Sequence, residues 1–261
     1  SKMSGAADTG IAKEQAAATP LPAEVTTTHA VEVNGKTLKF KAQVGAIPLY
    51  KGEGGERLAD IGYVAFSLEG SDVAKRPLTF ALNGGPGAGS VWLNLGALGP
   101  WRLPMEGESL APSAPPVPVA NAESWLEFTD LVFLDPVGTG YSKALVKPDE
   151  AKSLFTVEGD VDALALSIRK WIAANKRAAS PKFLVGESYG GFRAPRIARA
   201  LAEKQDVGLD GLILVSPVLD FAWMDGANNP QPHVARLPSY PAANRKIATE
   251  PRGTLGAVAE H

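Results

Sequence analysis

Four short apolar runs constrain the fold of this chain more than any other feature of its sequence. Each run is nearly uninterrupted in apolar character and ends in Gly, Pro or a polar residue. The runs are PLTFALN (77–83), DLVFLD (130–135), KFLVGE (182–187) and GLILVSP (211–217). Strands that are buried on both faces have this character, so the runs favour a parallel β-sheet that is covered by other elements.

Helical patterns alternate with the later runs. Apolar residues recur at helical spacing between residues 157 and 172, and PRIARALAEKQ (195–205) has a similar pattern. The order strand–helix–strand–helix–strand predicts an α/β fold. Upstream, residues 39–49 and 58–68 alternate loosely in polarity and are separated by a Gly-rich, charged stretch. This pattern predicts two antiparallel strands joined as a hairpin.

The composition excludes several classes of function. The formal net charge is −2, which gives no basic surface for nucleic acid or for an anionic membrane. No run approaches the roughly 18 apolar residues of a membrane span. The chain has no cysteine, so disulfides, thiolate catalysis and cysteine-based zinc sites are excluded. We expect neither a metal nor a cofactor.

The N-terminal segment, residues 1–30, is rich in Ala, Thr and small polar residues and has no apolar period, which predicts a flexible tail. It lacks the charged segment followed by an apolar one that marks a signal peptide. We therefore expect that any signal peptide has been removed or never existed. An exported protein, periplasmic or secreted, is the expected localisation.

The stretch GESYGG (186–191) places Ser188 in the pattern G-x-S-x-G. A serine on a sharp strand-to-helix turn has a strained backbone, and its neighbours two positions away must be small to avoid clashes. The hydroxyl is then held above the sheet, and the N-terminus of the following helix points at the developing oxyanion. An apolar run precedes Ser188 and a helical pattern follows it. The context therefore predicts a nucleophile rather than a plain Gly-rich turn.

A second Gly-rich stretch, NGGPGAGS (83–90), follows the first apolar run. Glycines let backbone N–H groups approach a ligand closely. In a hydrolase of this build, one oxyanion N–H comes from the residue after the nucleophile, Tyr189, and the other comes from this earlier loop, where we choose Gly85. A phosphate-binding loop is the alternative, but the stretch lacks both the Lys-Ser/Thr of a P-loop and G-x-G-x-x-G spacing.

Three motifs occur in order along the chain: NGGPGAGS, LVFLDPVGTGYS (131–142) and GESYGG. With them, the chain resembles the serine carboxypeptidase family of α/β-hydrolases over residues 60–220. The resemblance implies an α/β-hydrolase fold. Such a fold has a mixed, mostly parallel sheet with helices on both faces and antiparallel strands at the N-terminal end.

The resemblance also assigns roles to individual residues. Ser188 is the nucleophile that becomes acylated, and Gly85 and Tyr189 supply the oxyanion N–H groups. The free C-terminal carboxylate of a peptide is bound by Asn83, Gly84 and Glu187. A substrate carboxylate facing a glutamate is repelled unless one of the two carries a proton, so the site should work best at acidic pH.

The chain departs from the family pattern at three positions. Ala81 replaces the usual Trp, Ala88 replaces the usual Cys, and Ala97 replaces the acidic residue commonly found before L-G-P. The change at position 97 removes a partner of Glu187 and weakens the case for carboxylate recognition. An esterase or acyltransferase on the same scaffold is therefore one alternative function. A non-catalytic binding homologue is another.

The base and the acid of a catalytic triad are not evident in this chain. The family order is Ser, then Asp, then His, with both partners far downstream of the nucleophile. None of the three histidines has a convincing position: His29, His233 and His261. Asp220 and Asp225 are interpreted as loop or capping residues.

The domain interpretation follows from this gap. Residues 31–220 correspond to the N-terminal part of the hydrolase core, and residues 221–261 to the start of a cap insertion that is truncated or cleaved. We expect the catalytic Asp and His to come from a C-terminal segment absent from this chain, most simply a second chain bound non-covalently. A serine without a base is a poor nucleophile, so the isolated chain should be inactive or nearly so. Peptide or protein C-termini are the expected substrates.

Overall fold

The computed structural model describes residues 19–52, 54–104, 117–224, 229–237 and 239. It divides into two units, Ser1–Pro217 and Val218–His261. Within the second unit, the described elements are η4 (Phe221–Trp223) and α5 (Gln231–Arg236). Across the described ranges, no helix has both the length and the apolar character needed to cross a membrane.

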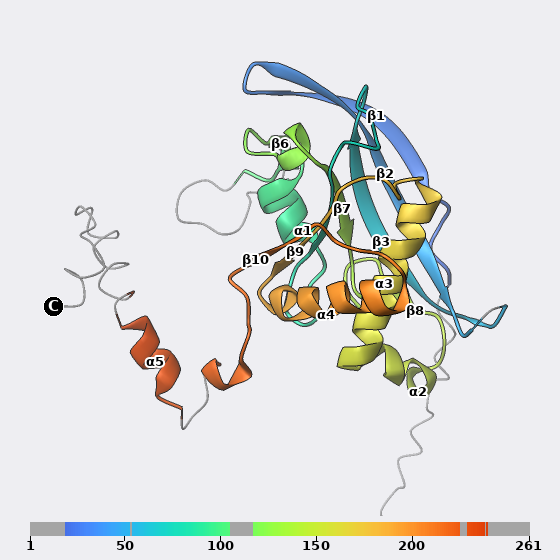
Figure 1. Ribbon diagram of the computed structural model, residues 1–261, viewed down its shortest axis with the longest axis vertical. Coiled ribbons are helices and arrows are strands. Elements are labelled where there is room, and N and C mark those ends of the chain that lie inside the picture. The colour runs from blue at the N-terminus through green and yellow to red at the C-terminus, as the bar shows by residue number, and fades with distance from the viewer. Residues whose placement is uncertain (1–18, 53, 105–116, 225–228, 238, 240–261) are drawn as a thin grey trace, which may run out of the picture. The chain divides into compact units, whose positions relative to one another are not determined.

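The main sheet of the first unit has the strand order β1-β2-β3-β7-β4-β9-β10, with β8 paired to β3 (Figure 1). The strands are β1 (Val25–Val33), β2 (Lys36–Tyr50), β3 (Arg57–Leu68), β4 (Leu78–Leu82), β7 (Asp130–Leu134), β8 (Lys143–Ala144), β9 (Lys182–Glu187) and β10 (Gly211–Val215). The first three are antiparallel to their neighbours, and β7, β4, β9 and β10 are parallel. The four apolar runs and the hairpin are thus confirmed as strands.

The first strand, β1, includes residues 25–30 of the segment expected to be a flexible tail, and that expectation is wrong for these residues. Residues 25–33 read VTTTHAVEV, in which β-branched residues favour an extended backbone. Val31 and Val33 are buried, whereas the residues between and before them are largely exposed. Pairing with β2 over its whole length holds this strand in place.

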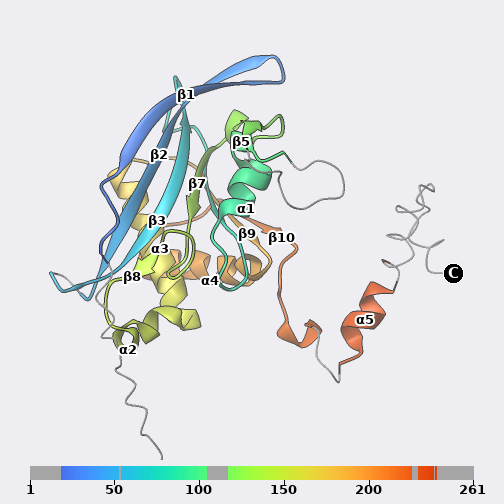
Figure 2. The ribbon, with the colours of Figure 1, turned by 180° about the vertical axis from the view of Figure 1, so that it is seen from behind.

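Helices cover both faces of the sheet (Figures 1 and 2). The long helices α3 (Val157–Ala174) and α4 (Tyr189–Lys204) pack on one face and confirm the helical patterns. The short helix α1 (Val91–Leu93) and the π-helical turn η1 (Asn94–Leu98) cover the other face. The remaining short elements are β5 (Trp101–Arg102), β6 (Val119–Ala120), η2 (Trp125–Glu127), α2 (Pro148–Ala151) and η3 (Lys152–Phe155).

A buried ionic network joins the N-terminal ends of the parallel strands. Asp130, the first residue of β7, accepts hydrogen bonds from Arg76 Nε at 2.7 Å and from Arg177 Nη1 at 2.5 Å. The exposed fraction of these side chains is 2% for Asp130, 10% for Arg76 and 4% for Arg177. The same carboxylate accepts from the backbone N–H of Leu68 in β3. One carboxylate therefore holds three segments together at the edge of the sheet opposite the carboxyl ends of these strands.

The last strand, β10, is parallel to β9 and pairs with no second strand in the part of the chain that the structure describes. Its sequence, GLILV, is as apolar as that of the interior strands. Yet Leu212, Leu214 and Val215 are 40%, 37% and 41% exposed. Strands of this composition are normally covered on both faces, so the edge at β10 is an unsatisfied surface.

Candidate active site

Ser188 lies at the turn between β9 and α4. Its backbone has φ 56° and ψ −118°, a conformation that L-residues rarely adopt. Its N–H donates to the carbonyl of Val215 at 2.9 Å, and its carbonyl accepts from Gly191 N at 2.9 Å. The side chain is half-buried rather than packed in the interior. This is the strained strand-to-helix turn that the sequence predicts for a nucleophilic serine.

The glycines around Ser188 are required by contact with neighbouring backbone. A Cβ at Gly186 would lie 2.2 Å from the carbonyl oxygen of Gly190. A Cβ at Gly190 would lie 2.6 Å from the carbonyl oxygen of Leu82 in the neighbouring strand β4. Both contacts are too short for a real side chain, so the G-x-S-x-G pattern has a packing cause in this fold.

The loop after β4 crosses directly over the serine turn. A Cβ at Gly84 would lie 2.6 Å from Tyr189 N, 2.7 Å from Ser188 Cβ and 2.8 Å from the carbonyl oxygen of Glu187. The next residue, Gly85, has φ 109°, which glycine adopts without strain. The structure therefore brings the two segments that were expected to supply oxyanion N–H groups against each other.

Asn83, Gly84 and Glu187 form one hydrogen-bonded cluster beside the serine. Asn83 Nδ2 donates to Glu187 Oε2 at 3.2 Å, and Gly84 N donates to the same oxygen at 3.3 Å. Asn83 is fixed in turn because its Oδ1 accepts from Leu93 N at 2.9 Å. The three residues predicted to bind a carboxylate are thus side by side at the carboxyl ends of β4 and β9, where ligands bind in open α/β sheets.

Asp135 anchors the loops around the site, a role that the sequence did not reveal. Its Oδ1 accepts from Ser90 N at 2.8 Å and its Oδ2 from Tyr141 N at 3.3 Å. Burial raises the pKa of this carboxyl group, and the two backbone N–H donors partly oppose the increase. Gly140 packs directly against the carboxylate, since a Cβ there would lie 1.9 Å from Oδ2. The motif LVFLDPVGTGYS therefore folds around its own aspartate.

Arg193, in the second turn of α4, is a second residue of the site that the sequence did not reveal. Its Nε donates to Asp160 Oδ2 of α3 at 2.5 Å, and its Nη1 donates to the carbonyl of Asn83 at 3.4 Å. Its guanidinium lies 4.9 Å from the ring centroid of Tyr189, within range of a cation–π contact. Burial raises the pKa of the Asp160 carboxyl, and the nearby Arg193 charge lowers it in part. The arginine thereby connects three segments of the site.

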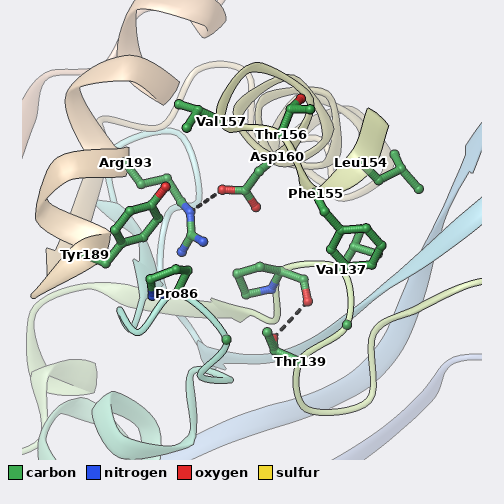
Figure 3. A pocket seen from close by; sticks show the side chains of 13 residues that line it. Pro86, Val137, Thr139, Leu154, Phe155, Thr156, Val157, Asp160, Tyr189 and Arg193 are labelled. Atoms are coloured by element: carbon green, nitrogen blue, oxygen red, sulfur yellow. Dashed lines mark hydrogen bonds and ion pairs between the residues drawn. The ribbon is translucent and has the colours of Figure 1, made fainter. Parts of the chain in front are cut away.

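The ion pair of Asp160 and Arg193 forms one wall of a cavity of about 280 Å³ (Figure 3). Two further residues of the wall, Pro86 and Gly87, directly follow Gly85 in the loop over the serine turn. The side chain of Tyr189 lines it as well. The cavity is therefore adjacent to the residues expected to bind the oxyanion.

The described residues of the first unit place no histidine near Ser188. His29, the single histidine of that unit, lies in β1, which four strands separate from β9. Its ring packs against Trp101, with centroids 4.9 Å apart. His233 belongs to α5 of the second unit, and His261 lies outside the described residues, as does Asp225. Asp220 caps η4 by accepting from Ala222 N at 2.8 Å, as a capping residue should.

A methyl group at Gly84 tests the contact between the two segments. For the hydrolase that the sequence predicts, completed by its missing segment, we expect Gly84→Ala to reduce kcat/KM by about 100-fold, because displacing the loop by about 1 Å misplaces the oxyanion donors. The measurement is hydrolysis rate alongside labelling of Ser188 by a fluorophosphonate. The matched control is Gly96→Ala, where the added Cβ meets no atom within 4 Å. Equal rates for the two variants would contradict the close approach of Gly84 to the turn.

Comparisons with known proteins agree with the geometry. A family model described as serine carboxypeptidase matches residues 55–231. Serine carboxypeptidase-like 29 of Arabidopsis thaliana is 30% identical over 158 residues, which are 57% of this chain and 31% of that protein. Pheromone-processing carboxypeptidase KEX1 of Yarrowia lipolytica is 32% identical over 158 residues, 60% of this chain and 23% of that protein. The chain thus spans less than a third of the length of these curated relatives.

The fold is shared by a solved structure. The crystal structure of a prohormone-processing carboxypeptidase from Saccharomyces cerevisiae matches with a TM-score of 0.56 and 22% identity. The match covers 82% of this chain and 48% of that chain. At this identity it speaks for the fold alone, and the expected α/β-hydrolase fold is confirmed.

Proposed function

Because the chain belongs to the serine carboxypeptidase family, we propose that it carries the nucleophile and the carboxylate-binding residues of a serine carboxypeptidase. One observation carries the proposal. The cluster of Asn83, Gly84 and Glu187 lies in direct contact with the turn that displays Ser188. A nucleophile beside a site for a carboxylate is what selective cleavage of a C-terminal peptide bond requires.

The proposed reaction proceeds through an acyl-enzyme. Ser188 Oγ attacks the carbonyl carbon of the last peptide bond and passes its proton to a histidine of the complementing segment. The carbonyl oxygen takes the negative charge and is stabilised by the N–H groups of Gly85 and Tyr189. The C–N bond then breaks, and the histidine returns the proton to the leaving amine. Water then attacks the ester carbonyl and gives a proton to the histidine, the bond between the acyl group and Ser188 Oγ breaks, and the histidine returns the proton to Oγ.

Glu187 gives the proposed enzyme a preference for acidic pH. Its carboxylate already accepts two hydrogen bonds from the residues that would hold the substrate carboxylate. Two carboxylates at this position repel each other unless they share a proton. Substrate binding should therefore weaken as pH rises and the shared proton is lost. Ala97 stands where the family commonly has an acidic residue, which makes this preference weaker than the family pattern implies.

We propose that the catalytic Asp and His belong to a complementing polypeptide segment, either a second chain or the remainder of a longer one. Support comes from the position of His29, far across the sheet from Ser188. It comes also from the exposed apolar edge at β10, which a further parallel strand would cover. The relatives are about three to four times as long as the matched region, which leaves room for such a segment. The isolated chain should then be inactive.

The decisive experiment compares peptides that differ only at their C-terminus. With the complementing segment present, we expect release of the last residue from a free peptide to exceed that from its C-terminal amide by about 100-fold or more, because the amide cannot share the proton with Glu187. Release is followed by mass spectrometry of the products. Equal rates would remove the exopeptidase proposal and leave an esterase or acyltransferase on this scaffold, which Ala81 and Ala97 favour.

A non-catalytic binding homologue is distinguished by covalent labelling. Absence of a fluorophosphonate adduct on Ser188 in the completed protein would favour that alternative, since an activated serine reacts with such probes. An exported location, periplasmic or secreted, remains a prediction. The proposed reaction involves neither a nucleic acid nor a membrane.

A further inference from the structure

The cavity beside the serine turn has walls of two kinds (Figure 3). Most of the wall is apolar and comes from the loop after β4, the 136–139 loop, η3 and the start of α3. These apolar residues are Pro86, Pro136, Val137, Leu154, Phe155 and Val157. The ion pair of Asp160 and Arg193 supplies the polar part. A pocket that is mainly apolar with a few convergent polar groups is the usual form of a small-molecule or side-chain site.

The cavity lies beside the part of the loop after β4 that follows the carboxylate-binding cluster along the chain. The loop after β4 runs from Asn83 and Gly84, which contact Glu187, past Gly85 to Pro86 and Gly87, which line the cavity. No residue of the carboxylate-binding cluster lines the cavity. A peptide whose terminal carboxylate lies at the cluster therefore extends its acyl side, across the oxyanion position, towards the cavity.

The two charges in the wall neutralise each other but keep hydrogen-bonding capacity. Arg193 Nε donates to Asp160 Oδ2 at 2.5 Å, and Arg193 Nη1 makes only a long bond of 3.4 Å to Asn83. Among the described residues, none donates to Asp160 Oδ1 and none accepts from Arg193 Nη2. Figure 3 shows the guanidinium and the carboxylate both directed towards the space between α3, α4 and the loops.

The two threonine hydroxyl groups of the wall are already engaged. Thr139 Oγ1 donates to the carbonyl of Pro136 at 2.8 Å, and Thr156 Oγ1 donates to the carbonyl of Ser153 at 2.9 Å. Thr156 also accepts from Gly159 N as the N-cap of α3. The ion pair therefore supplies the charged groups of the wall that can discriminate between polar guests.

Building on the proposed function, we infer that this cavity binds the side chain of the residue on the acyl side of the scissile bond and selects an uncharged one, with the carboxamide of Gln as the best complement. A carboxamide can accept from the guanidinium and donate to the carboxylate at once. A Glu or Lys side chain satisfies one member of the pair and repels the other, and it loses its own hydration on entering. Apolar side chains such as Leu fit the remaining wall.

The test uses the completed enzyme and two substrate series with an acyl-side residue of Gln, Leu, Glu or Lys. One series consists of N-blocked dipeptides that all end in Ala. The other consists of the matching esters, which need no C-terminal carboxylate. For both, we expect kcat/KM for Gln and Leu to exceed that for Glu and Lys by about tenfold or more. The rate is followed by release of Ala or of the alcohol.

Two variants should move this preference in opposite directions. Asp160→Asn leaves the Arg193 charge unopposed and should raise kcat/KM for Glu relative to Gln by about tenfold. Val157→Glu places a negative charge at the rim, on a side chain that is 39% exposed, and should raise the value for Lys instead. Val157→Gln is the uncharged control and should leave the ranking unchanged. If these residues had a purely structural role, the substitutions would lower kcat/KM for all four substrates together.

The outcomes separate the two proposals. If the wild-type enzyme cleaves neither series, the proposed function fails, and this inference fails with it. If it cleaves the esters but not the dipeptides, the exopeptidase proposal fails while the side-chain preference is still measured. If it cleaves either series with Glu or Lys preferred, or if Asp160→Asn and Val157→Glu leave the ranking unchanged, the inference alone is overturned.

Discussion

Replacing Ser188 by Ala in the completed enzyme should reduce kcat by about 10⁴-fold or more, because the atom that forms the acyl-enzyme is lost. Labelling by a fluorophosphonate should disappear as well. The residual rate would report what the oxyanion donors and substrate binding contribute without a nucleophile. Retention of labelling in Ser188→Ala would show that another side chain is the nucleophile and would end the proposal.

Two inactive variants at the same position should differ in stability, because their residues fit the strained backbone of the turn differently. The backbone of Ser188, with φ 56° and ψ −118°, is readily adopted by glycine alone. Ser188→Gly should therefore be more stable than Ser188→Ala by about 1 kcal/mol, although both are inactive. Urea unfolding of the two variants gives the comparison. A lower stability for the glycine variant would mean that the turn is unstrained.

Replacing Asp130 by Ala should cost about 3–5 kcal/mol of unfolding free energy, because it leaves two buried guanidinium groups without a counter-charge. Arg76 and Arg177 have 10% and 4% of their side chains exposed, so water cannot replace the lost carboxylate. The N–H of Leu68 loses its acceptor too. In thermal unfolding of the chain, the expected decrease in Tm is about 10 °C.

The matched control for this variant is Asp162→Ala. Asp162 pairs with Lys204 at 2.7 Å, but their side chains are 46% and 54% exposed. Exposed pairs of this kind contribute about 1 kcal/mol or less. A difference of under about 1 kcal/mol between the two variants would contradict the view that the network at Asp130 holds the sheet together.

The sequence predicted those parts of the fold that depend on local pattern. The runs at β4, β7, β9 and β10 are recognisable because burial on both faces permits few polar residues. The strand β1 was missed because its threonines are polar as well as β-branched, and only its pairing with β2 shows that they are extended. The β-branched residues are the local signal for this strand, but the polar composition of the segment masks it.

The candidate site was predicted where backbone geometry dictates sequence. Glycines at 84, 186 and 190 are forced by contacts at 2.6 Å, 2.2 Å and 2.6 Å, and they leave a readable motif. The pair of Asp160 and Arg193 leaves none, because an acid and a base 33 positions apart, on two different helices, meet only in the folded chain. The role of Asp135 has the same cause: its partners, Ser90 and Tyr141, come from separate loops.

The parallel strands β4, β7 and β9 begin at the ionic network around Asp130 and end at the residues of the candidate site. The residues that stabilise the sheet and those of the candidate site therefore lie at opposite rims of one sheet. Homologues can exchange residues in the 136–139 loop or at the start of α3 while the anchor at the far rim is untouched. Residues at the rim of the candidate site should therefore change faster between related proteins than Asp130 and its partners at the other rim. A sequence survey across related species can measure this contrast.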